Sequence, residues 1–429
     1  MEILDAYNLI IEASIIVILS FIFGEIARKT NVPAVLMLIA LGIGMKFALD
    51  ALGLGDLNFF PVLEVLGIVG LIMIVLEAAL ELELKPEKIK PILQALVIAL
   101  LGLMASAWAA ASILLHYIPE LTTVQAWLYA TPLSILSSAI VIPTVSGLRQ
   151  HKKEFHIYES TFSDILGIML FYFLAGQIDT GNGAHSSGIA GFFGNFGLTV
   201  AIALVASYGI VLIFQNIKSH VKLFLLISVL LLLYALGKKM HLSSLIIILV
   251  FGLVIANMKL FFRGKLADWL HLEKASSIYE GLHVVTGETA FVVRTFFFVI
   301  FGLTISLASL ANVQVALISG LIILTIYAIR WVLLRLFLGQ DYLPQLFIAP
   351  RGLITVLLFY AIPVEAQVDG FEPGILLFII ISTSLIMTFG MVWDKRRTGQ
   401  AVQKAKGLPV GYANWKAPAV EDVVAEKKK

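Results

Sequence analysis

Apolar runs of about 20 residues recur along this chain from one end to the other, and a helix needs about that length to cross a bilayer. Hydrophobic residues make up 60% of the 429, and only 14% are charged. A soluble domain has far more charge, so this composition indicates a membrane protein. We predict an all-α polytopic fold, because a helix satisfies its own backbone hydrogen bonds in lipid.

Charged residues and clusters of Gly, Pro and Asn divide the apolar runs into thirteen predicted spans. Lys and Arg check this count, because they gather in cytoplasmic segments. Eighteen of them fall on one side of the predicted topology and three on the other, with the N-terminus outside and the C-terminus in the cytoplasm. The predicted spans are 7–27, 32–49, 60–82, 91–117, 124–148, 156–178, 188–214, 220–237, 242–258, 285–309, 312–337, 344–363 and 373–393.

Several classes of function find no support in the residues. The chain has no cysteine, which excludes thiol catalysis and disulfides, and its histidines lack the spacing of a metal site. No glycine loop that could hold a phosphate is found, so we predict no nucleotide-binding domain, no nucleic-acid partner, no cofactor and no enzyme activity. The acidic N-terminus favours a retained first span over a signal peptide.

Two predicted spans contain helix-breaking residues at corresponding places. Span 5 carries Pro143 in ILSSAIVIPTVSG, and span 12 carries Pro350 and Gly352 in IAPRGLIT. If spans 1–6 and 8–13 form an inverted repeat, these spans are equivalent. Paired discontinuous helices are typical of a transporter's binding site, because helix ends and freed carbonyls can hold an ion.

Charged groups within predicted spans require partners, because an isolated charge in the bilayer costs at least about 2.5 kcal/mol. Span 6 contains the sequence ESTFSD, in which Glu159 and Asp164 lie five residues apart and so on different faces of a helix. Arg330 of span 11 could neutralise Glu159, and we interpret these two residues as a structural ion pair. Asp164 has no equally simple partner, which favours a functional role for it.

The surroundings of Asp164 suit a small monovalent cation. Span 6 adds the hydroxyls of Ser160 and Ser163, and span 5 adds Ser137 and Ser138 with carbonyls freed by the break. A carboxyl group removed from water can also hold a proton. A site that takes either a cation or a proton predicts an exchanger with one-for-one stoichiometry.

These motifs resemble the monovalent cation/proton antiporter superfamily, and within it the sodium/proton exchanger branch. That branch has Glu-Ser-x-x-Asn-Asp on span 6, which ESTFSD matches except at Ser163. Its arginine on span 11 is matched by Arg330, and its Gly-Leu-Arg-Gly-like turn on span 12 is matched by Arg351 and Gly352. The resemblance implies that Asp164 carries the ion and proton and that Ser160 is a cation ligand.

The resemblance also implies a homodimer of thirteen-helix subunits embedded in lipid, working as an elevator. The dimerisation part would cover about 1–85 and 188–310, and the ion-transport core about 90–180 and 312–393, within one membrane domain of 1–393. Residues 394–429 would form a short basic cytoplasmic tail. A bacterial or archaeal plasma membrane and a role in pH homeostasis are expected.

Two departures from the branch leave ion choice open between sodium and potassium. No acid precedes Pro143, as in the potassium-efflux branch, and Ser163 replaces the asparagine of electroneutral exchangers. Lacking a second acid, the site favours electroneutral exchange. A monovalent cation channel and an organic-anion carrier on the same fold are the alternative functions.

Other charged residues and one mixed segment also carry a signal in the sequence. Arg294 of span 10 could pair with Glu288 or lie near the ion pathway, and Glu77 is expected at a solvated rim. His156 is expected at the membrane interface. The mixed apolar and charged segment 259–283 predicts a helix lying on the cytoplasmic surface, with an ordinary linker as the alternative.

Overall fold

The computed structural model describes most of the chain and leaves its two ends and several loops aside. The described residues are 6–30, 34–51, 60–82, 84, 88–145, 148–178, 189–217, 222–239, 244–262, 264–269, 271–304, 312–368 and 370–406. Predictions for the tail beyond 406 therefore lie outside the described residues.

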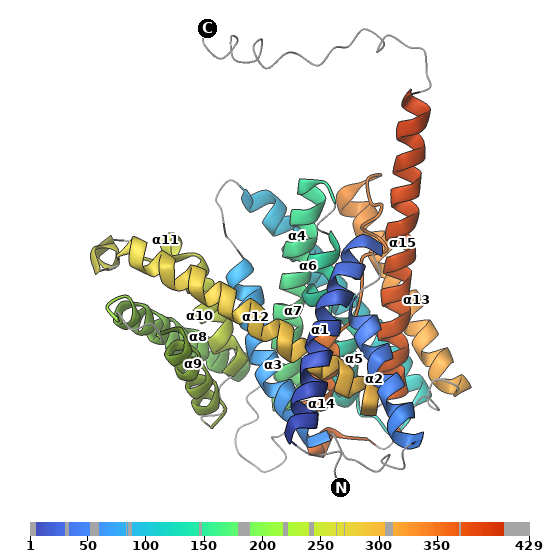
Figure 1. The fold of residues 1–429 in the computed structure, drawn as a ribbon, viewed down its shortest axis with the longest axis horizontal. Helices are drawn as coiled ribbons and strands as arrows, with labels where there is room; N and C mark the ends of the chain where they lie inside the picture. Colours follow the sequence, from blue (N-terminus) through green and yellow to red (C-terminus); the bar gives the residue numbers. More distant parts are fainter. Residues whose placement is uncertain are drawn as a thin grey trace.

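The predicted all-α fold is confirmed, because every regular element among the described residues is a helix (Figure 1). The α-helices are α1 (Ala6–Thr30), α2 (Ala34–Ala51), α3 (Phe60–Glu81), α4 (Ile89–Tyr117), α5 (Thr123–Ser134), α6 (Ser138–Thr144), α7 (Gln150–Ile178), α8 (Ile189–Phe214), α9 (Lys222–Lys239), α10 (Ser244–Ala256), α11 (Met258–Phe261), α12 (Leu272–Thr304), α13 (Val313–Leu338), α14 (Leu353–Tyr360) and α15 (Gly374–Lys406). Two short 3₁₀ helices, Gly264–Trp269 and Val364–Ala366, complete the set.

Eight helices in the described part of the chain are long and apolar enough to cross a membrane. Large apolar side chains such as Phe21, Phe224 and Phe389 are exposed on the outside of the bundle, as expected where helices face lipid. The predicted count of thirteen spans stays a prediction.

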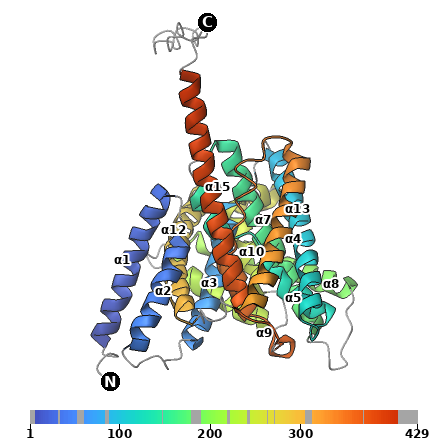
Figure 2. The same ribbon diagram turned by 90° about the vertical axis from the view of Figure 1, so that its right-hand side faces the viewer.

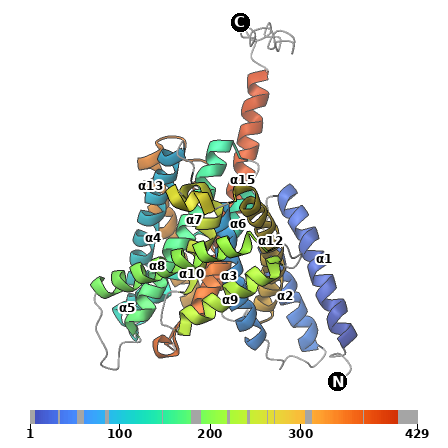
Figure 3. The same cartoon turned by 90° about the vertical axis from the view of Figure 1, so that its left-hand side faces the viewer.

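The helices pack into two groups. In the α12 group, α12 packs on α2 and α3, α10 packs on α3, α8 and α9, and α1 packs on α2. In the α7 group, α4 packs on α5, α7 and α13, while α6 and α14 lie against α7 and α15 lies against α13. Figures 2 and 3 show the two groups from opposite sides.

Contacts between the two groups are fewer, and we call this contact surface the seam. At the seam, α3 and α10 pack against α7, and α3 also packs against α14. The Asn257 side chain, at the end of α10, donates to the Leu82 carbonyl at 2.8 Å and accepts from the Leu84 N–H at 2.6 Å, which fixes the chain leaving α3.

The start of the first helix and the end of the last helix lie near opposite ends of the molecule. The start of α1 is at the bottom of Figures 1 and 2, and α15 ends at the top, beyond the other helices. This helix runs 33 residues, past the predicted end of its span at 393. The predicted sidedness of the termini is not tested by this arrangement.

The predicted surface helix over 259–283 is wrong. The segment forms α11, the 3₁₀ helix Gly264–Trp269 and the first turns of α12, which continues without a break to Thr304. Gly264 has a φ of +62°, a conformation that does not continue an α-helix and that glycine adopts at little cost.

Candidate ion-binding site

Both predicted interruptions are present. The first separates α5 from α6 at residues 135–137, and the second is an irregular stretch that ends at Gly352, before α14. The two interruptions touch each other, because the Ser137 N–H donates to the Pro350 carbonyl at 3.0 Å. The middle of the α7 group is therefore a crossing of two non-helical segments.

Three consecutive N–H groups at the first interruption lack helical partners, and each one finds an acceptor elsewhere. This pattern matters because buried backbone donors are almost always paired. The donors and acceptors are Leu136 to Ser163 Oγ at 2.9 Å, Ser137 to the Pro350 carbonyl at 3.0 Å, and Ser138 to Asp164 Oδ2 at 3.3 Å. The chain is held open here by α7 and by the other interruption.

The position predicted for the first break was wrong by several residues. Pro143 lies inside α6, next to its last residue, whereas the break precedes Ser138. The proline has a different effect, since it has no N–H to donate to the carbonyl four residues earlier. That carbonyl, of Ala139, instead accepts a hydrogen bond from Arg294 at 3.3 Å.

Gly352 is required by the close approach of the two interruptions. A Cβ atom at this position would lie 2.6 Å from Ser137 Oγ and 2.8 Å from Ile140 Cδ1. Real Cβ atoms do not approach other atoms so closely, so a residue with a Cβ would force the Ser137 side chain, the Ile140 side chain or the crossing segments to shift.

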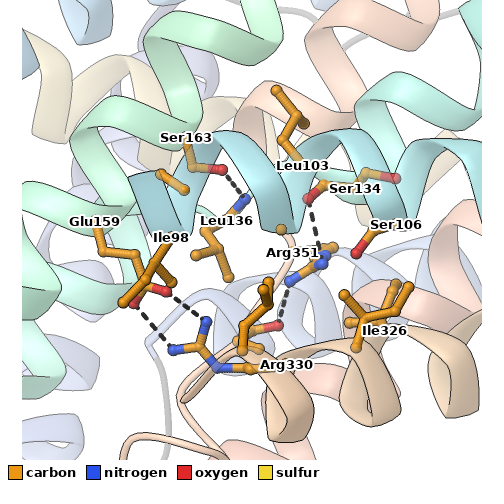
Figure 4. Close-up of a pocket in the computed structure, with 15 residues that line it drawn as sticks. Ile98, Leu103, Ser106, Ser134, Leu136, Glu159, Ser163, Ile326, Arg330 and Arg351 are labelled. Carbon is orange, nitrogen blue, oxygen red and sulfur yellow. Dashed lines mark hydrogen bonds and ion pairs between the residues drawn. The ribbon is translucent and has the colours of Figure 1, made fainter. Parts of the chain in front are cut away.

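Arg351 occupies the crossing and binds backbone carbonyls instead of an acid. Its guanidinium donates to the carbonyls of Leu133 at 3.0 Å, Ala349 at 2.8 Å and Ser134 at 3.3 Å. Figure 4 shows the bond from Arg351 to Ser134. Two of these carbonyls belong to the last turn of α5, where a helix carries partial negative charge. The arginine therefore stabilises a helix end that stops in the middle of the protein.

The Glu159 carboxylate contacts one side chain from α13 and one from its own helix, α7. Arg330 of α13 binds the carboxylate through two nitrogens, at 2.7 and 3.0 Å (Figure 4). The third guanidinium nitrogen of Arg330 donates to the Gln345 carbonyl at 3.0 Å. His156 Nδ1 lies 3.2 Å from the same carboxylate. Only 1% of His156 is exposed, one turn from Glu159, so this side chain is buried inside the protein. Its expected position at the membrane interface stays a prediction.

Asp164 has a different environment on the same helix. It is 2% exposed, and its Oδ2 accepts from the Ser138 N–H. Its Oδ1 has no hydrogen-bond partner, and among the described residues no basic side chain pairs with it. A buried carboxyl group with no counter-charge and a free oxygen thus lies at the crossing.

The predicted hydroxyl ligands surround Asp164 in different ways. Ser160, one turn before it on α7, donates to the His156 carbonyl at 2.7 Å and keeps its lone pairs free. Ser137 Oγ is buried without a partner. Ser163 instead holds the Leu136 N–H, which makes it part of the scaffold of the break.

A second ion pair, between Arg294 and Glu77, lies in the seam. Arg294 of α12 pairs with Glu77 of α3 at 2.9 Å, and not with the exposed Glu288. The Glu77 side chain is 25% exposed and lines a cavity of about 50 Å³ that also contains Glu81 and Ser138. The N–H of Ser138 binds Asp164, so this cavity lies one residue from the buried carboxyl group.

Another small cavity lies next to the crossing and is lined by residues of α4, α5, α7 and α13. Its volume of about 30 Å³ leaves room for one or two waters. Figure 4 shows Glu159, Arg330 and Arg351 around it, with Ser134 and Ser163. These polar groups suit bound water better than an apolar ligand.

The described residues contain no cluster of three or more acidic or histidine side chains that could hold a metal ion. The acceptors at the crossing are one carboxylate and several neutral oxygens. A single negative charge with neutral oxygens suits a monovalent cation better than a divalent one.

Comparison with known proteins decides the family. A model of the transmembrane sodium/hydrogen exchanger family matches residues 15–393. The chain belongs to the sodium/hydrogen exchanger family. The resemblance inferred from ESTFSD, Arg330 and the span 12 turn is thereby confirmed, and the chain is a multi-pass integral membrane protein of a transporter family.

The fold agrees with solved structures of one antiporter. The structure of the sodium proton antiporter MjNhaP1 from Methanocaldococcus jannaschii at pH 8 matches with a TM-score of 0.64 and 20% identity, covering 91% of this chain and 97% of that chain. An electron-microscopy structure of MjNhaP1 matches with a TM-score of 0.64 and 18% identity, covering 97% and 100%. No curated protein sequence matches the chain.

Proposed function

We propose that this member of the sodium/hydrogen exchanger family exchanges a monovalent cation for a proton, with Asp164 as the group that carries either one. The observation that carries the proposal is the isolation of this carboxyl group. It is buried at the crossing, has one free oxygen and has no paired cation among the described residues. A charged carboxylate left there would be costly, so a bound ion or proton stabilises it.

Exchange follows if the site can cross the membrane only while the Asp164 carboxyl group is neutralised. A sodium ion and a proton each cancel one negative charge, and one carboxyl group cannot hold both. Glu159 does not add a second carrier, because Arg330 already neutralises it. We therefore propose electroneutral exchange of one cation for one proton.

The oxygens around Asp164 supply the cation ligands in this proposal. Ser160 and Ser137 have lone pairs available, and the Asp164 carboxylate provides the charge. Sodium is the proposed cation because of the family, and potassium is the alternative. Exchange of this kind would serve cation and pH homeostasis at a plasma membrane.

Transport further requires that the site face each side of the membrane in turn. We propose that the α7 group is the moving core and that the α12 group is the scaffold and the homodimer surface. The seam supports this division, because contacts across it are sparse compared with contacts inside each group. Sliding of the α7 group along the seam would carry Asp164 as in an elevator.

The test is proton flux in liposomes that contain the purified chain. A pH gradient is imposed, and sodium, potassium, lithium or choline is added. We expect proton movement only with the cation that the site accepts, and none for Asp164→Asn. Asp50→Asn is the matched control, because the same change is made at an exposed carboxyl group near the end of α2.

Three outcomes would contradict the proposal. Substantial exchange by Asp164→Asn would remove the carrier role of Asp164. Cation current without proton coupling would favour a channel, and proton flux indifferent to sodium and potassium would favour an organic-anion carrier.

A further inference from the structure

Thr161, which lies between Ser160 and Asp164 in the chain, has an unusual hydroxyl group. The residue is 0% exposed, and its Oγ1 has no hydrogen-bond partner. Helical Ser and Thr hydroxyls usually donate to the carbonyl three or four residues earlier, as Ser134, Ser160 and Thr289 do here. The Thr161 hydroxyl is therefore turned away from its own backbone.

The geometry of α7 gives the direction of this hydroxyl. Thr161 precedes Asp164 by three residues, so the two side chains are neighbours on one face of the helix. Glu159 lies two residues from Thr161 and hence on the opposite side, where it binds Arg330 of α13. Thr161 consequently points away from α13.

The side chains one turn before and one turn after Thr161 have neighbours in several helices. Tyr158 and Ile165 belong to an apolar cluster with Leu82, which follows α3, and Leu253 of α10, together with residues of α4 and α13 such as Leu334. Helical geometry therefore gives the clearest placement: Thr161 lies on the flank of Asp164 that is turned away from Glu159 and its partner on α13.

Thr161, Asp164 and Ser137 each have a buried oxygen without a hydrogen-bond partner. Unpaired buried polar atoms are uncommon and call for an explanation such as an ion. A small cation needs several oxygens, and neutral hydroxyls complete its shell without changing the charge that Asp164 balances.

We propose that Thr161 Oγ1 is a further ligand of the transported cation and sets the affinity of the site for it. This inference rests on the proposed function and names a residue that the exchanger motif ESTFSD leaves unassigned. Ser160 lies on one flank of Asp164 and Thr161 on the other, so the cation is held from both sides.

The test compares Thr161→Val, which keeps the shape and removes the hydroxyl, with Thr161→Ser, which restores the hydroxyl. Exchange in liposomes is measured against sodium concentration at fixed pH. We expect Thr161→Val to raise the half-saturating sodium concentration about 10-fold with little change in maximal rate, since a ligand to a charged group is lost. Thr161→Ser should recover most of the affinity.

Thr286→Val is the matched control, because Thr286 in α12 is also 0% exposed with an unpartnered hydroxyl. It should leave the sodium dependence unchanged. Sodium-induced thermal stabilisation of each purified variant provides a second readout that does not depend on transport. That stabilisation should weaken in Thr161→Val alone.

Two results would overturn the inference. Unchanged sodium affinity in Thr161→Val, with Asp164→Asn inactive, would reject Thr161 as a ligand and leave the proposed exchange intact. A fall in maximal rate at unchanged affinity would show a structural role for Thr161. If Asp164→Asn still exchanged ions, the proposed function itself would fail.

Discussion

Two acids on α7, Glu159 and Asp164, are almost equally buried yet have opposite surroundings. Glu159 binds a guanidinium through two oxygens and also contacts His156. Asp164 binds one N–H of the crossing and keeps one oxygen free. The difference shows how one helix can hold a fixed charge and an exchangeable one five residues apart, because its two faces contact different helices.

The largest effect on stability is expected from Glu159→Ala. The change leaves Arg330 buried without its acid, and breaking a buried pair in this way costs about 3–5 kcal/mol. We expect poor expression and a much lower Tm, measured in detergent by thermal unfolding. Asp164→Asn removes no ion pair and should keep a Tm close to that of the native chain. Equal losses in the two variants would contradict the contrast between the acids.

Replacing both members of the Glu159 pair sharpens the same comparison. The double variant Glu159→Leu, Arg330→Met removes both charges together, so it should recover much of the stability lost by either single change. A double-mutant cycle on Tm or on unfolding free energy measures this coupling. Additive losses would show that the two side chains do not act as a pair.

Gly352→Ala tests the crossing that gives Asp164 its surroundings. The added methyl group would meet Ser137 Oγ at 2.6 Å, and overpacking of this kind costs about 1–3 kcal/mol. We expect a lower Tm together with reduced exchange, because Ser137 and the Ser138 N–H would shift. Gly320→Ala in α13, where nothing lies within 4 Å of the added Cβ, is the control and should leave exchange unchanged with an equal or slightly higher Tm, because Ala favours a helix more than Gly does.

The partly exposed pair of Arg294 and Glu77 should matter less. Their side chains are 18% and 25% exposed, and solvent weakens such pairs, so Glu77→Gln should cost about 1 kcal/mol. Unfolding of the single and double variants measures the coupling. A loss of stability as large as that of Glu159→Ala would mean that water screens this ion pair less than the exposure of its two side chains indicates.

The smallest effect is expected for Lys88 and Glu154, which pair at 2.6 Å with side chains 35% and 22% exposed. Glu154→Gln should change the unfolding free energy by about 0.2–1 kcal/mol and leave exchange unaffected. A change in the cation dependence of exchange would show that this surface pair is coupled to the site.

The sequence predicted the elements of the site that follow from local chemistry. Apolar runs set most helix positions, and the need to neutralise a buried acid led to the pairing of Glu159 with Arg330. The exact site of the first break was missed, because Ser163, Pro350 and Asp164 hold it open through tertiary contacts, whereas the sequence drew attention to Pro143.

Other features of the site depend on contacts between distant parts of the chain. Two possibilities were left open for Arg294, a pair with Glu288 on its own helix or a position near the ion pathway, and it binds Glu77, which is 217 positions away. Pro143 did contain a usable signal, since a proline frees the carbonyl four residues earlier. The burial of His156 and the free hydroxyl of Thr161 became visible only with the helices packed.

The most direct test of the exchangeable carboxyl group is proton release when sodium binds to the purified chain in weakly buffered detergent. The account predicts that sodium displaces protons from the native chain, with at most one proton for each cation bound, and that Asp164→Asn releases none. Sodium binding without proton release at every pH where exchange occurs, or release that persists in Asp164→Asn, would contradict it.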